Sequence, residues 1–541
     1  MRKQTLVRLV TLVLVLCMAA TMMLACDKNK TPENTTPQAT TPPTGGDQLS
    51  GEALEYLPTV KDLGNYEYRM YIGMMEGDEG IQYFKSADGL SGDAISQALY
   101  ERNTYIEETY NCIITPLLSI RTEATQRECY EIQPYLDSNE DLWDVFLIGA
   151  GDIMQKNVQR GDVIDVLQMP NLNLSASYWD QAIQKDYCLN GKVFALQGDY
   201  TIQDELSTTC VFYNDKIWKE WSYHETYGSP YEMVAANEWT YNTMLEMLKD
   251  TSKRADGITF TENDVYGMFM HTSGIHTLLL GSGLKILTVE NGESVIAVED
   301  NTTFNNVFDL LNDVIKNTYV SNDEILIAAT PRATQIITTK SGVHEMFIAD
   351  QALFYMDTIG GAVGLRDMTS VFGILPIPQY YENQTEYFCL NNGHSPLTVP
   401  KTVVTHDHVE EVSTLMEVMA YHSRYAANGA LSLYDAFYDK MTVAKVCRSA
   451  EDYKMMELIY YSKCYDIDNA AAFSRIYHYS HYMQLEKQVF YGPGATGSSG
   501  LYSLKPDYSA LRSQLSSLRS KINETVSVYL ADMENNYVVI E

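Results

Sequence analysis

Aromatic rings and carboxylates lie close together in one part of the sequence. The aromatic pair Tyr178 and Trp179 is followed by Asp199 and Tyr200 and then by Asp204. A carbohydrate presents apolar C–H faces and a rim of hydroxyl groups, so its site needs rings against the faces and carboxylates that accept from the rim. We therefore expect these five residues to bind a polar, ring-shaped ligand. The alternative is that Trp179 packs at the edge of a lobe and Tyr178 is a surface residue.

Two further aspartates follow predicted β-strands. Asp152 comes after the strand 144–148 and a Gly-Ala-Gly turn, and Asp357 ends the strand that begins at Ala352. In parallel α/β sheets, ligands bind beyond the carboxyl ends of the strands. We expect both aspartates to contact the ligand. Asp152 is also a candidate N-cap for the next helix, and the two roles can coexist.

The sequence offers only weak candidates for catalysis. Asp204 and Glu205 are paired acids of the kind that glycosidases use, but adjacent residues in an extended segment point to opposite sides. The chain contains no G-x-S-x-G, Walker or H-E-x-x-H motif. We therefore predict a binding protein without catalytic residues.

Histidines provide the only hints of a metal site. They occur as His406 and His408 with Glu410 and Glu411 beside them, and as His478 and His481. Neither group has a third ligand at a diagnostic spacing. We predict no metal ion and no cofactor.

The N-terminus is typical of an exported lipoprotein. A positive segment with Arg2, Lys3 and Arg8 precedes an apolar run that ends in Met-Leu-Ala-Cys26. This ending resembles a bacterial lipobox, although Met stands where Leu is usual. We expect residues 1–25 to be a signal peptide and Cys26 to carry the lipid on the extracellular face of the cell membrane. An uncleaved membrane anchor is the alternative.

Charge and size exclude several classes of protein. The formal net charge is −33, and removal of the first 25 residues takes away three cations and no acid, which leaves −36. Such a charge repels nucleic acid. At 541 residues and 45% hydrophobic content, the chain is long enough for more than one core.

The seven cysteines after Cys26 show no C-x-x-C spacing, so no disulfide framework is predicted. The sequence leaves open whether a single disulfide bond forms.

The hydrophobic pattern predicts an α/β fold. Alternation over 66–72 predicts a strand, helical spacing predicts a helix from Asp93 to Tyr110, and two further strands follow. Asn190-Gly191 predicts a hairpin turn. The other predicted elements are strands at 112–115, 144–148, 208–213, 352–356 and 371–376, helices from 238–240 and over 304–315, and a mainly helical region from Val409 that ends in a helix marked by Leu511, Leu515, Leu518 and Ile522.

Several segments, in this order, resemble the extracellular solute-binding proteins of ABC importers, in particular the long carbohydrate-type lipoproteins of clostridia. The segments are AISQALYERNTYIEETYN (94–111), WDVFLIGAG (143–151), SASYWDQ (175–181), LNGKVFALQGD (189–199), VFYNDKIW (211–218), NEWT (237–240), ADQALFYM (349–356), FGILPIPQYYENQTEYF (372–388) and LTVPKT (397–402). The resemblance runs from about Tyr66 to the C-terminus. It implies a two-lobe, type II periplasmic-binding-protein-like fold that closes on its ligand at a hinge.

The resemblance also implies a division of the chain. After the signal peptide, 26–60 would be a disordered Thr/Pro-rich tether. The first lobe would span 61–203 with 376–428 returning to it, and the second 204–375 with the mainly helical 429–541. The chain would cross near 199–213 and return near 373–378. Relatives often carry a calcium-type loop that here, from Lys253 to Gly267, keeps too few carboxylates, so we predict no calcium ion.

The implied partners are a carbohydrate ligand, which we expect to be an oligosaccharide, ABC permease subunits and a membrane reached through the lipid anchor. We expect a monomer that binds no nucleic acid. Two alternatives stay open from the sequence. The chain could be a cell-surface carbohydrate-active enzyme, or a lipoprotein that binds peptides or serves a sensor.

Replacement of Cys26 tests the lipoprotein prediction. Cys26→Ser removes the thiol that would be acylated, so we expect the variant to be released from the membrane or mislocalised. Membrane fractionation and the mass of the mature N-terminus measure this. A Ser variant that is processed and membrane-bound like the wild type would contradict acylation at Cys26.

Overall fold

The computed structural model describes most of the chain beyond its N-terminal region. The described residues are 57–59, 61–73, 94–119, 128–254, 265–270, 274–285, 287–290, 293–296, 306–307, 310, 320–321, 340–380, 384–391, 395–426, 429–443, 446–467, 470 and 508–540. All of them belong to the compact unit Leu49–Glu541. Some predictions lie outside the described residues, namely those for the signal peptide, Cys26, most of the tether, most of the helix 304–315, the loop 255–264, and His478 and His481.

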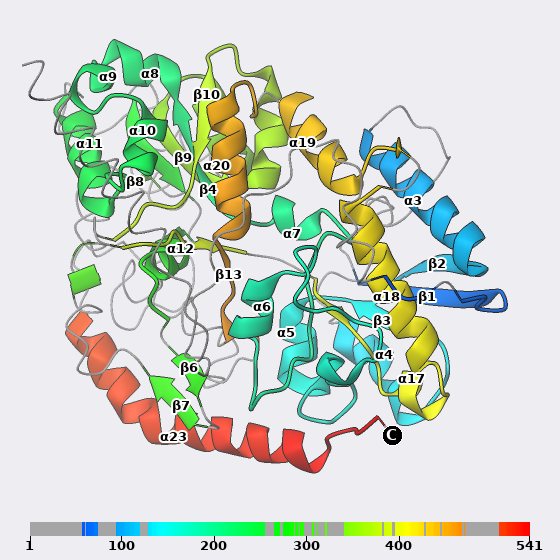
Figure 1. Cartoon of the computed structure of the whole chain (residues 1–541). Coiled ribbons are helices and arrows are strands. Elements are labelled where there is room, and N and C mark those ends of the chain that lie inside the picture. Colours follow the sequence, from blue (N-terminus) through cyan, green and yellow to red (C-terminus); the bar gives the residue numbers. More distant parts are fainter. Residues whose placement is uncertain are drawn as a thin grey trace, which may run out of the picture. The chain divides into compact units, whose positions relative to one another are not determined.

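Helices and strands alternate along much of the described chain (Figure 1). The strands are β1 (Tyr66–Ile72), β2 (Cys112–Leu118), β3 (Val145–Leu147), β4 (Thr209–Asn214), β5 (Tyr266–Met270), β6 (Leu287–Glu290), β7 (Glu293–Ile296), β8 (Val320–Ser321), β9 (Ala352–Thr358), β10 (Phe372–Leu375), β11 (Cys389–Leu390), β12 (Leu397–Thr398) and β13 (Lys463–Cys464). The helices are α3 (Ala94–Tyr110), α4 (Glu128–Asp137), α5 (Ala150–Asp152), η2 (Ile153–Asn157), η3 (Val166–Gln168), α6 (Gln181–Asp186), α7 (Gln203–Leu206), α8 (Asp215–Glu220), α9 (Tyr223–Thr226), α10 (Pro230–Ala235), α11 (Tyr241–Arg254), α12 (Gly274–Gly281), α16 (Lys340–Ile348), η4 (Ile359–Asp367), α17 (Thr402–Thr405), α18 (Val409–Arg424), α19 (Leu433–Val443), α20 (Ala450–Tyr461) and α23 (Tyr508–Asn535).

The first sheet has the strand order β12-β3-β1-β2. β1 pairs in parallel with β2 and with β3, and β12 pairs antiparallel with β3. Parallel neighbours require a crossover connection, which α3 supplies between β1 and β2 and α4 supplies between β2 and β3. The parallel strand–helix–strand pattern predicted from the sequence is therefore confirmed.

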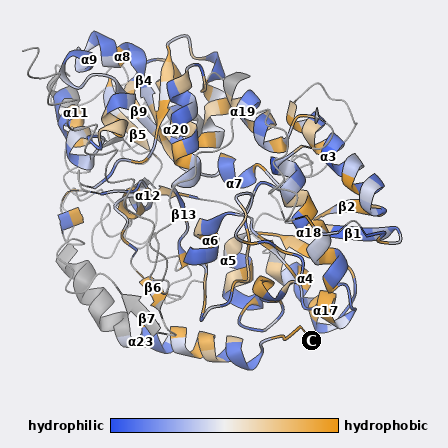
Figure 2. Cartoon of the chain, in the orientation of Figure 1, coloured by the Kyte–Doolittle hydropathy of each residue, from blue (hydrophilic) through white to orange (hydrophobic). Residues whose placement is uncertain are grey.

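The second sheet is mixed and has the order β10-β4-β9-β5-β8. β5 pairs in parallel with β8 and β9, whereas β4 pairs antiparallel with β9 and β10. Every residue of β4, β5 and β10 is buried. Strands of this kind need cover on both faces, and the surrounding helices provide it. In Figure 2 these helices change between hydrophilic and hydrophobic residues along their length, as amphipathic helices do.

Each sheet has its own hydrophobic core. Met70, Ile114 and Leu147 of the first sheet pack with Leu415 of α18. Phe212 and other residues of the second sheet pack with α19 and α20. We call the first sheet with its core the first lobe, and the second sheet with its core the second lobe. The α/β prediction with two lobes is confirmed at this level, whereas the lobe boundaries given above stay predictions.

The described part of the chain passes between the lobes several times, and three of these passages are the following. It leaves the first lobe after Leu196, which bridges to Leu397, and enters the second at β4. It returns between Gln379, which still bridges to Thr240 beside the second sheet, and β12. The third passage joins α18, in the first core, to α19, in the second. We call residues 199–208 the crossing segment.

The C-terminal helix α23 departs from the predicted division. The sequence prediction assigned all of 429–541 to the second lobe. Ile522, Val526 and Tyr529 of α23 instead pack with Phe146 of β3 and with Tyr187. The apolar spacing correctly predicts a helix here, but spacing alone does not say which lobe receives its apolar face.

Local sequence signals fix several details. Asn190 and Gly191 both have positive φ, 51° and 76°, as a two-residue hairpin turn of this kind requires, and Leu189 bridges to Lys192 around them. Trp239 is fully buried and donates to the Pro376 carbonyl at 2.8 Å. All seven cysteines after Cys26 are free. No helix among the described residues is long and apolar enough to span a membrane.

Candidate functional site

The aromatic pair predicted to face the ligand is buried in the core of the first lobe. Tyr178 is 2% exposed and Trp179 is 1% exposed. Both side chains donate to Glu417 of α18: the Tyr178 hydroxyl to one carboxyl oxygen, and Trp179 Nε1 to the other at 3.0 Å. The Asn173 amide also donates to Glu417, at 3.1 Å. Burial raises the pKa of Glu417, while these donors oppose the rise.

This arrangement favours packing for the two rings. A ring that stacks on a sugar needs an open face, and neither ring has one in this structure. The Tyr178 hydroxyl and Trp179 Nε1 instead supply hydrogen bonds to the carboxyl group of Glu417, which is itself fully buried. The assignment of Tyr178 and Trp179 to the ligand stays a prediction, and the burial supports the alternative stated from the sequence for Trp179.

Asp152 and Asp357 lie apart from each other. Asp152 is inside α5, after the Gly149 turn, and accepts a weak hydrogen bond from the Cys129 thiol at 3.6 Å. Asp357 is near the end of β9 and accepts from the Tyr355 hydroxyl at 2.6 Å. Both follow strands, as predicted, and their contact with a ligand stays a prediction.

The remaining predicted residues, Asp199, Tyr200 and Asp204, lie on the crossing segment, inside a network of buried charges. Asp199 accepts from the Tyr460 hydroxyl at 2.7 Å and from Arg424 Nη1 at 3.2 Å. Tyr460 lies in the last turn of α20 and Arg424 ends α18, so Asp199 joins the crossing segment to helices of both lobes. Burial raises the pKa of Asp199, and Arg424 opposes this most strongly.

Lys463 of β13 is the centre of this network. Its ammonium lies 2.7 Å from Asp204 Oδ2, 3.2 Å from Asp180 Oδ2 and 3.6 Å from Glu205 Oε1. Asp180 also accepts from the Tyr465 hydroxyl at 2.7 Å and caps the N-terminus of α6. Burial alone would lower the pKa of Lys463, but the three carboxylates raise it well above its ordinary value.

We call the following residues the crossing cluster: Asp180, Asp199, Asp204, Glu205, Arg424, Tyr460, Lys463 and Tyr465. It contains four carboxyl groups and two cationic side chains, all buried. Buried ions are tolerated only when they are paired and hydrogen-bonded, because the loss of hydration is costly. The cluster therefore depends on the close fit of the crossing segment, α6, α18, α20 and β13.

Tyrosine rings surround the cationic part of the crossing cluster. The Arg424 guanidinium lies 3.7 Å from the ring centre of Tyr434, and Lys463 Nζ lies 4.3 Å from that of Tyr460. Tyr461 packs edge-on against Tyr460 and is 54% exposed. Its hydroxyl accepts from Arg424 at 3.3 Å. An open ring next to carboxylates is the combination that suits a sugar.

The sequence interpretation missed the residues that complete this site. They are Arg424, Tyr434, Tyr460, Tyr461 and Lys463, which lie far along the chain from the crossing segment. A signal was present in the run 457–466, ELIYYSKCYD, where tyrosines flank a single lysine among acids. The spacing could not show that this run meets Asp199 and Asp204, because the contact is tertiary.

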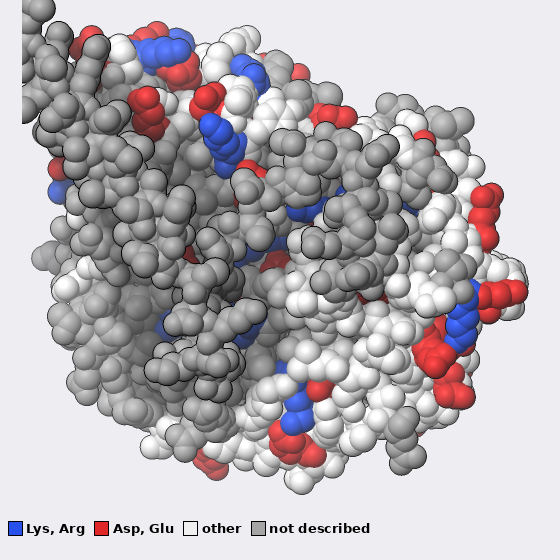
Figure 3. All heavy atoms as spheres, in the orientation of Figure 1, with Lys and Arg blue, Asp and Glu red and all other residues white. Residues whose placement is uncertain are grey.

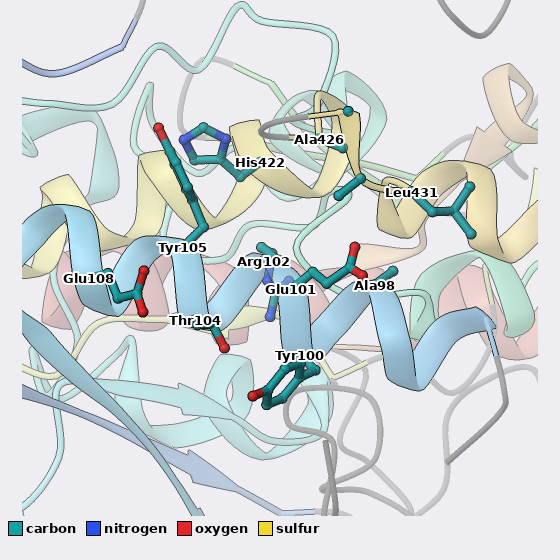
Figure 4. Close-up of a pocket in the computed structure, with 12 residues that line it drawn as sticks. Ala98, Tyr100, Glu101, Arg102, Thr104, Tyr105, Glu108, His422, Ala426 and Leu431 are labelled. Atoms are coloured by element: carbon teal, nitrogen blue, oxygen red, sulfur yellow. The ribbon is translucent and has the colours of Figure 1, made fainter. Parts of the chain in front are cut away.

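A groove of about 420 Å³ lies where α18 continues toward α19 (Figure 4). Tyr105 of α3 and His422 of α18 face one another there, with ring centres 4.8 Å apart. Burial lowers the pKa of His422 to about 4, so its imidazole is neutral at neutral pH. Arg102 lines the groove and donates to the Tyr200 carbonyl at 2.7 Å and to the Ser423 hydroxyl at 2.8 Å. Arg102 thus fixes the crossing segment to α18 beside the crossing cluster.

The predicted absence of a metal ion stays a prediction. Within the part of the chain that the structure describes, no three His, Cys, Asp or Glu residues are placed to hold a metal ion. His406 instead lies 3.0 Å from the Asn139 carbonyl, and His408 lies 3.1 Å from Asp141.

Acidic side chains gather at the right-hand edge of the face in Figure 3, with basic side chains among them.

No family model and no curated protein matches the sequence. Solved structures do match. An ABC substrate-binding protein from Listeria monocytogenes in complex with cycloalternan has 12% identity and a TM-score of 0.43, over 87% of this chain and 97% of that one. A cyclo/maltodextrin-binding protein complexed with maltotetraose has 8% identity and a TM-score of 0.49, over 87% and 96%. A sugar transporter protein from Rhizobium etli, in an open conformation, has 13% identity and a TM-score of 0.49, over 86% and 98%.

These proteins are of the class that the sequence segments resemble. All three identities are low and all three TM-scores are below 0.5. The ligands of those proteins are therefore not transferred to this chain.

Substitution of Trp179 separates packing from ligand binding. Trp179→Ala removes a fully buried ring and one of the two donors to Glu417 Oε2, so we expect a loss of about 3–5 kcal/mol in stability. Trp179→Phe should recover part of it, because a ring remains. A thermal melt and a calorimetric titration of the same samples measure both quantities. An unchanged melt with affinity reduced by about one to two decades would place the ring at the ligand instead.

Proposed function

We propose that this protein is a membrane-tethered extracellular receptor that delivers a carbohydrate, most simply an oligosaccharide, to an ABC importer. The receptor itself performs no chemistry. Its two lobes close around the ligand, and the closed form is recognised by permease subunits in the membrane. Cys26 carries the lipid that holds the receptor at the extracellular face.

The observation that carries this proposal is the position of the crossing cluster. The cluster joins the crossing segment to α18 and to β13 and α20, so it lies where the chain passes between the lobes. Binding proteins that work by domain closure place their ligand between lobes and absorb the motion in a few connecting residues. The half-exposed ring of Tyr461 supplies an apolar face for a sugar at this position, whereas the carboxylates of the crossing cluster are buried in this structure and would reach a ligand only after the lobes open.

The sequence supports the same conclusion independently. The ordered segments from 94–111 to 397–402 resemble solute-binding proteins, and the lipobox-like ending at Cys26 fits a tether. The strongly acidic chain is compatible with a neutral ligand and opposes a polyanionic one. The seven residues predicted from the sequence remain part of the proposal, with Asp199 and Asp204 closest to the site described here.

A ligand screen tests the function. The full chain, in detergent, is incubated with neutral mono- and oligosaccharides and with peptides, and the melting temperature is recorded for each. We expect a neutral oligosaccharide to raise the melting temperature, because a ligand that binds only the folded state stabilises it. Stabilisation by peptides alone would favour the peptide-binding alternative, and cleavage products in the glycan samples would favour an enzyme.

Substitution of Tyr461 tests the location of the sugar. Tyr461→Ala removes a half-exposed ring without opening the core, so we expect affinity for the best glycan to fall by about tenfold, or about 1.4 kcal/mol, with little change in the melt. Tyr461→Phe should keep most of the affinity if the ring face is what binds. Tyr130→Ala, which removes an exposed tyrosine of α4 outside the groove, is the matched control. Equal affinities for Tyr461→Ala and the control would exclude Tyr461 from the site.

A further inference from the structure

Glu205 of α7 is the one carboxyl group of the crossing cluster to which no described residue donates a hydrogen bond. Its side chain is buried, and both carboxyl oxygens lack a donor. Asp204 and Asp180, by contrast, accept from Lys463 and Tyr465, and Asp199 accepts from Arg424 and Tyr460. An ionised carboxylate in this position would lose its hydration without compensation.

The groups that face Glu205 come from every element around α7. Asp204 is its neighbour on α7, and Asp199 and Tyr200 lie on the crossing segment. Lys463 of β13 approaches to 3.6 Å, and Tyr460 of α20 also interacts with it electrostatically. From η4, Gly360 approaches Leu206 and brings no charge. In Figure 1, β13 runs between α20 and α6, close to α7.

The charges of these groups do not balance if every acid is ionised. Asp180, Asp199, Asp204 and Glu205 would carry four negative charges, against two positive charges on Arg424 and Lys463. One proton on Glu205 removes a buried charge and also turns an acceptor without a donor into an O–H that donates to Asp204. The single proton therefore removes both the excess buried charge and the missing hydrogen bond.

We propose that Glu205 holds a proton while the crossing segment is docked on β13, and that loss of this proton as the pH rises destabilises the docked arrangement, because a second buried negative charge then lies beside Asp204. The crossing cluster is then a proton-sensitive connection between the lobes. This goes beyond the proposed function, because it concerns the empty protein and holds for any ligand. Lobe opening would be easier in an alkaline medium than in a mildly acidic one.

The sign of the effect follows from the direction of the shift. Burial, and then the charge of Asp204, raise the pKa of Glu205 well above its ordinary value, while Lys463 opposes the rise. The folded state therefore binds a proton that the unfolded state has released. Its contribution to stability is fully present below the unfolded pKa and is lost as the pH rises toward the folded pKa.

Urea unfolding of the full chain in detergent, from about pH 6.5 to about pH 9, tests the proposal. His422 titrates mainly below this range. Burial lowers its pKa from the ordinary value of 6.5 to about 4, so His422 makes the stability rise with pH only between these two values. In the wild type we expect the folding equilibrium constant to fall by up to about tenfold per pH unit over part of the range. Glu205→Gln keeps the shape and the donor without the titration, so its profile should be flatter, and it should be more stable than the wild type at the alkaline end.

The control is Glu238→Gln, which neutralises an exposed acid outside the crossing cluster. Its profile should follow that of the wild type. Equal slopes for the wild type and Glu205→Gln would overturn the proposal. If Glu205→Gln does not fold, infrared difference spectra of the wild type decide: a protonated-carboxyl band that disappears as the pH rises supports the proposal, and its absence at neutral pH overturns it. Neither measurement needs a sugar, so failure of the proposed ligand would not affect the result.

Discussion

The contact of Lys463 with Asp180, Asp204 and Glu205 is the interaction on which the connection between the lobes depends. One ammonium joins β13 to the cap of α6 in the first lobe and to α7 on the crossing segment. β13 in turn pairs with β11, and the Asn391 amide nitrogen beyond β11 bonds to the Cys464 carbonyl at 2.9 Å. The lysine is buried, so the loss of its partners would leave an uncompensated charge. The crossing segment is therefore held by electrostatic fit as much as by apolar packing.

A second contact restrains the same segment from the other side. Arg102 of α3 binds the Tyr200 carbonyl and Ser423, while Arg424, next in the chain, binds Asp199. Arg102 and Arg424 thus bind two adjacent residues of the crossing segment, Tyr200 and Asp199. The groove lined by Arg102 lies next to these contacts (Figure 4). Any movement of one lobe against the other must change these contacts, and a connection of this kind has few stable arrangements.

Much of the fold could be predicted from the sequence because it depends on local patterns. Alternation gave β1 its bounds of Tyr66–Ile72, and the apolar spacing gave α3. The site could be predicted only in part. The chemistry of Asp199 and Asp204 was visible, but their partners lie 225 to 261 residues away along the chain. The same limit applies to Trp179: its composition suits a sugar site, and only the distant Glu417 shows that its polar tip is used inside the core.

The high tyrosine content has a physical explanation in the charge of the chain. There are 71 acidic side chains and only 38 basic ones, so at least 33 carboxylates cannot have a cationic partner of their own. Tyrosine hydroxyls take that role at several buried or partly buried acids: Tyr66 donates to Asp144, Tyr178 to Glu417, Tyr231 to Asp452, Tyr460 to Asp199, Tyr465 to Asp180 and Tyr537 to Asp165. A phenol brings a donor and an apolar ring without a second charge to desolvate. Burial also raises the pKa of these phenols, Tyr460 and Tyr465 among them, so they remain donors at neutral pH. The abundance of tyrosine therefore reflects first how an acidic chain satisfies its buried carboxylates. Tyrosines such as Tyr461, whose rings remain open, are the ones left to meet a ligand.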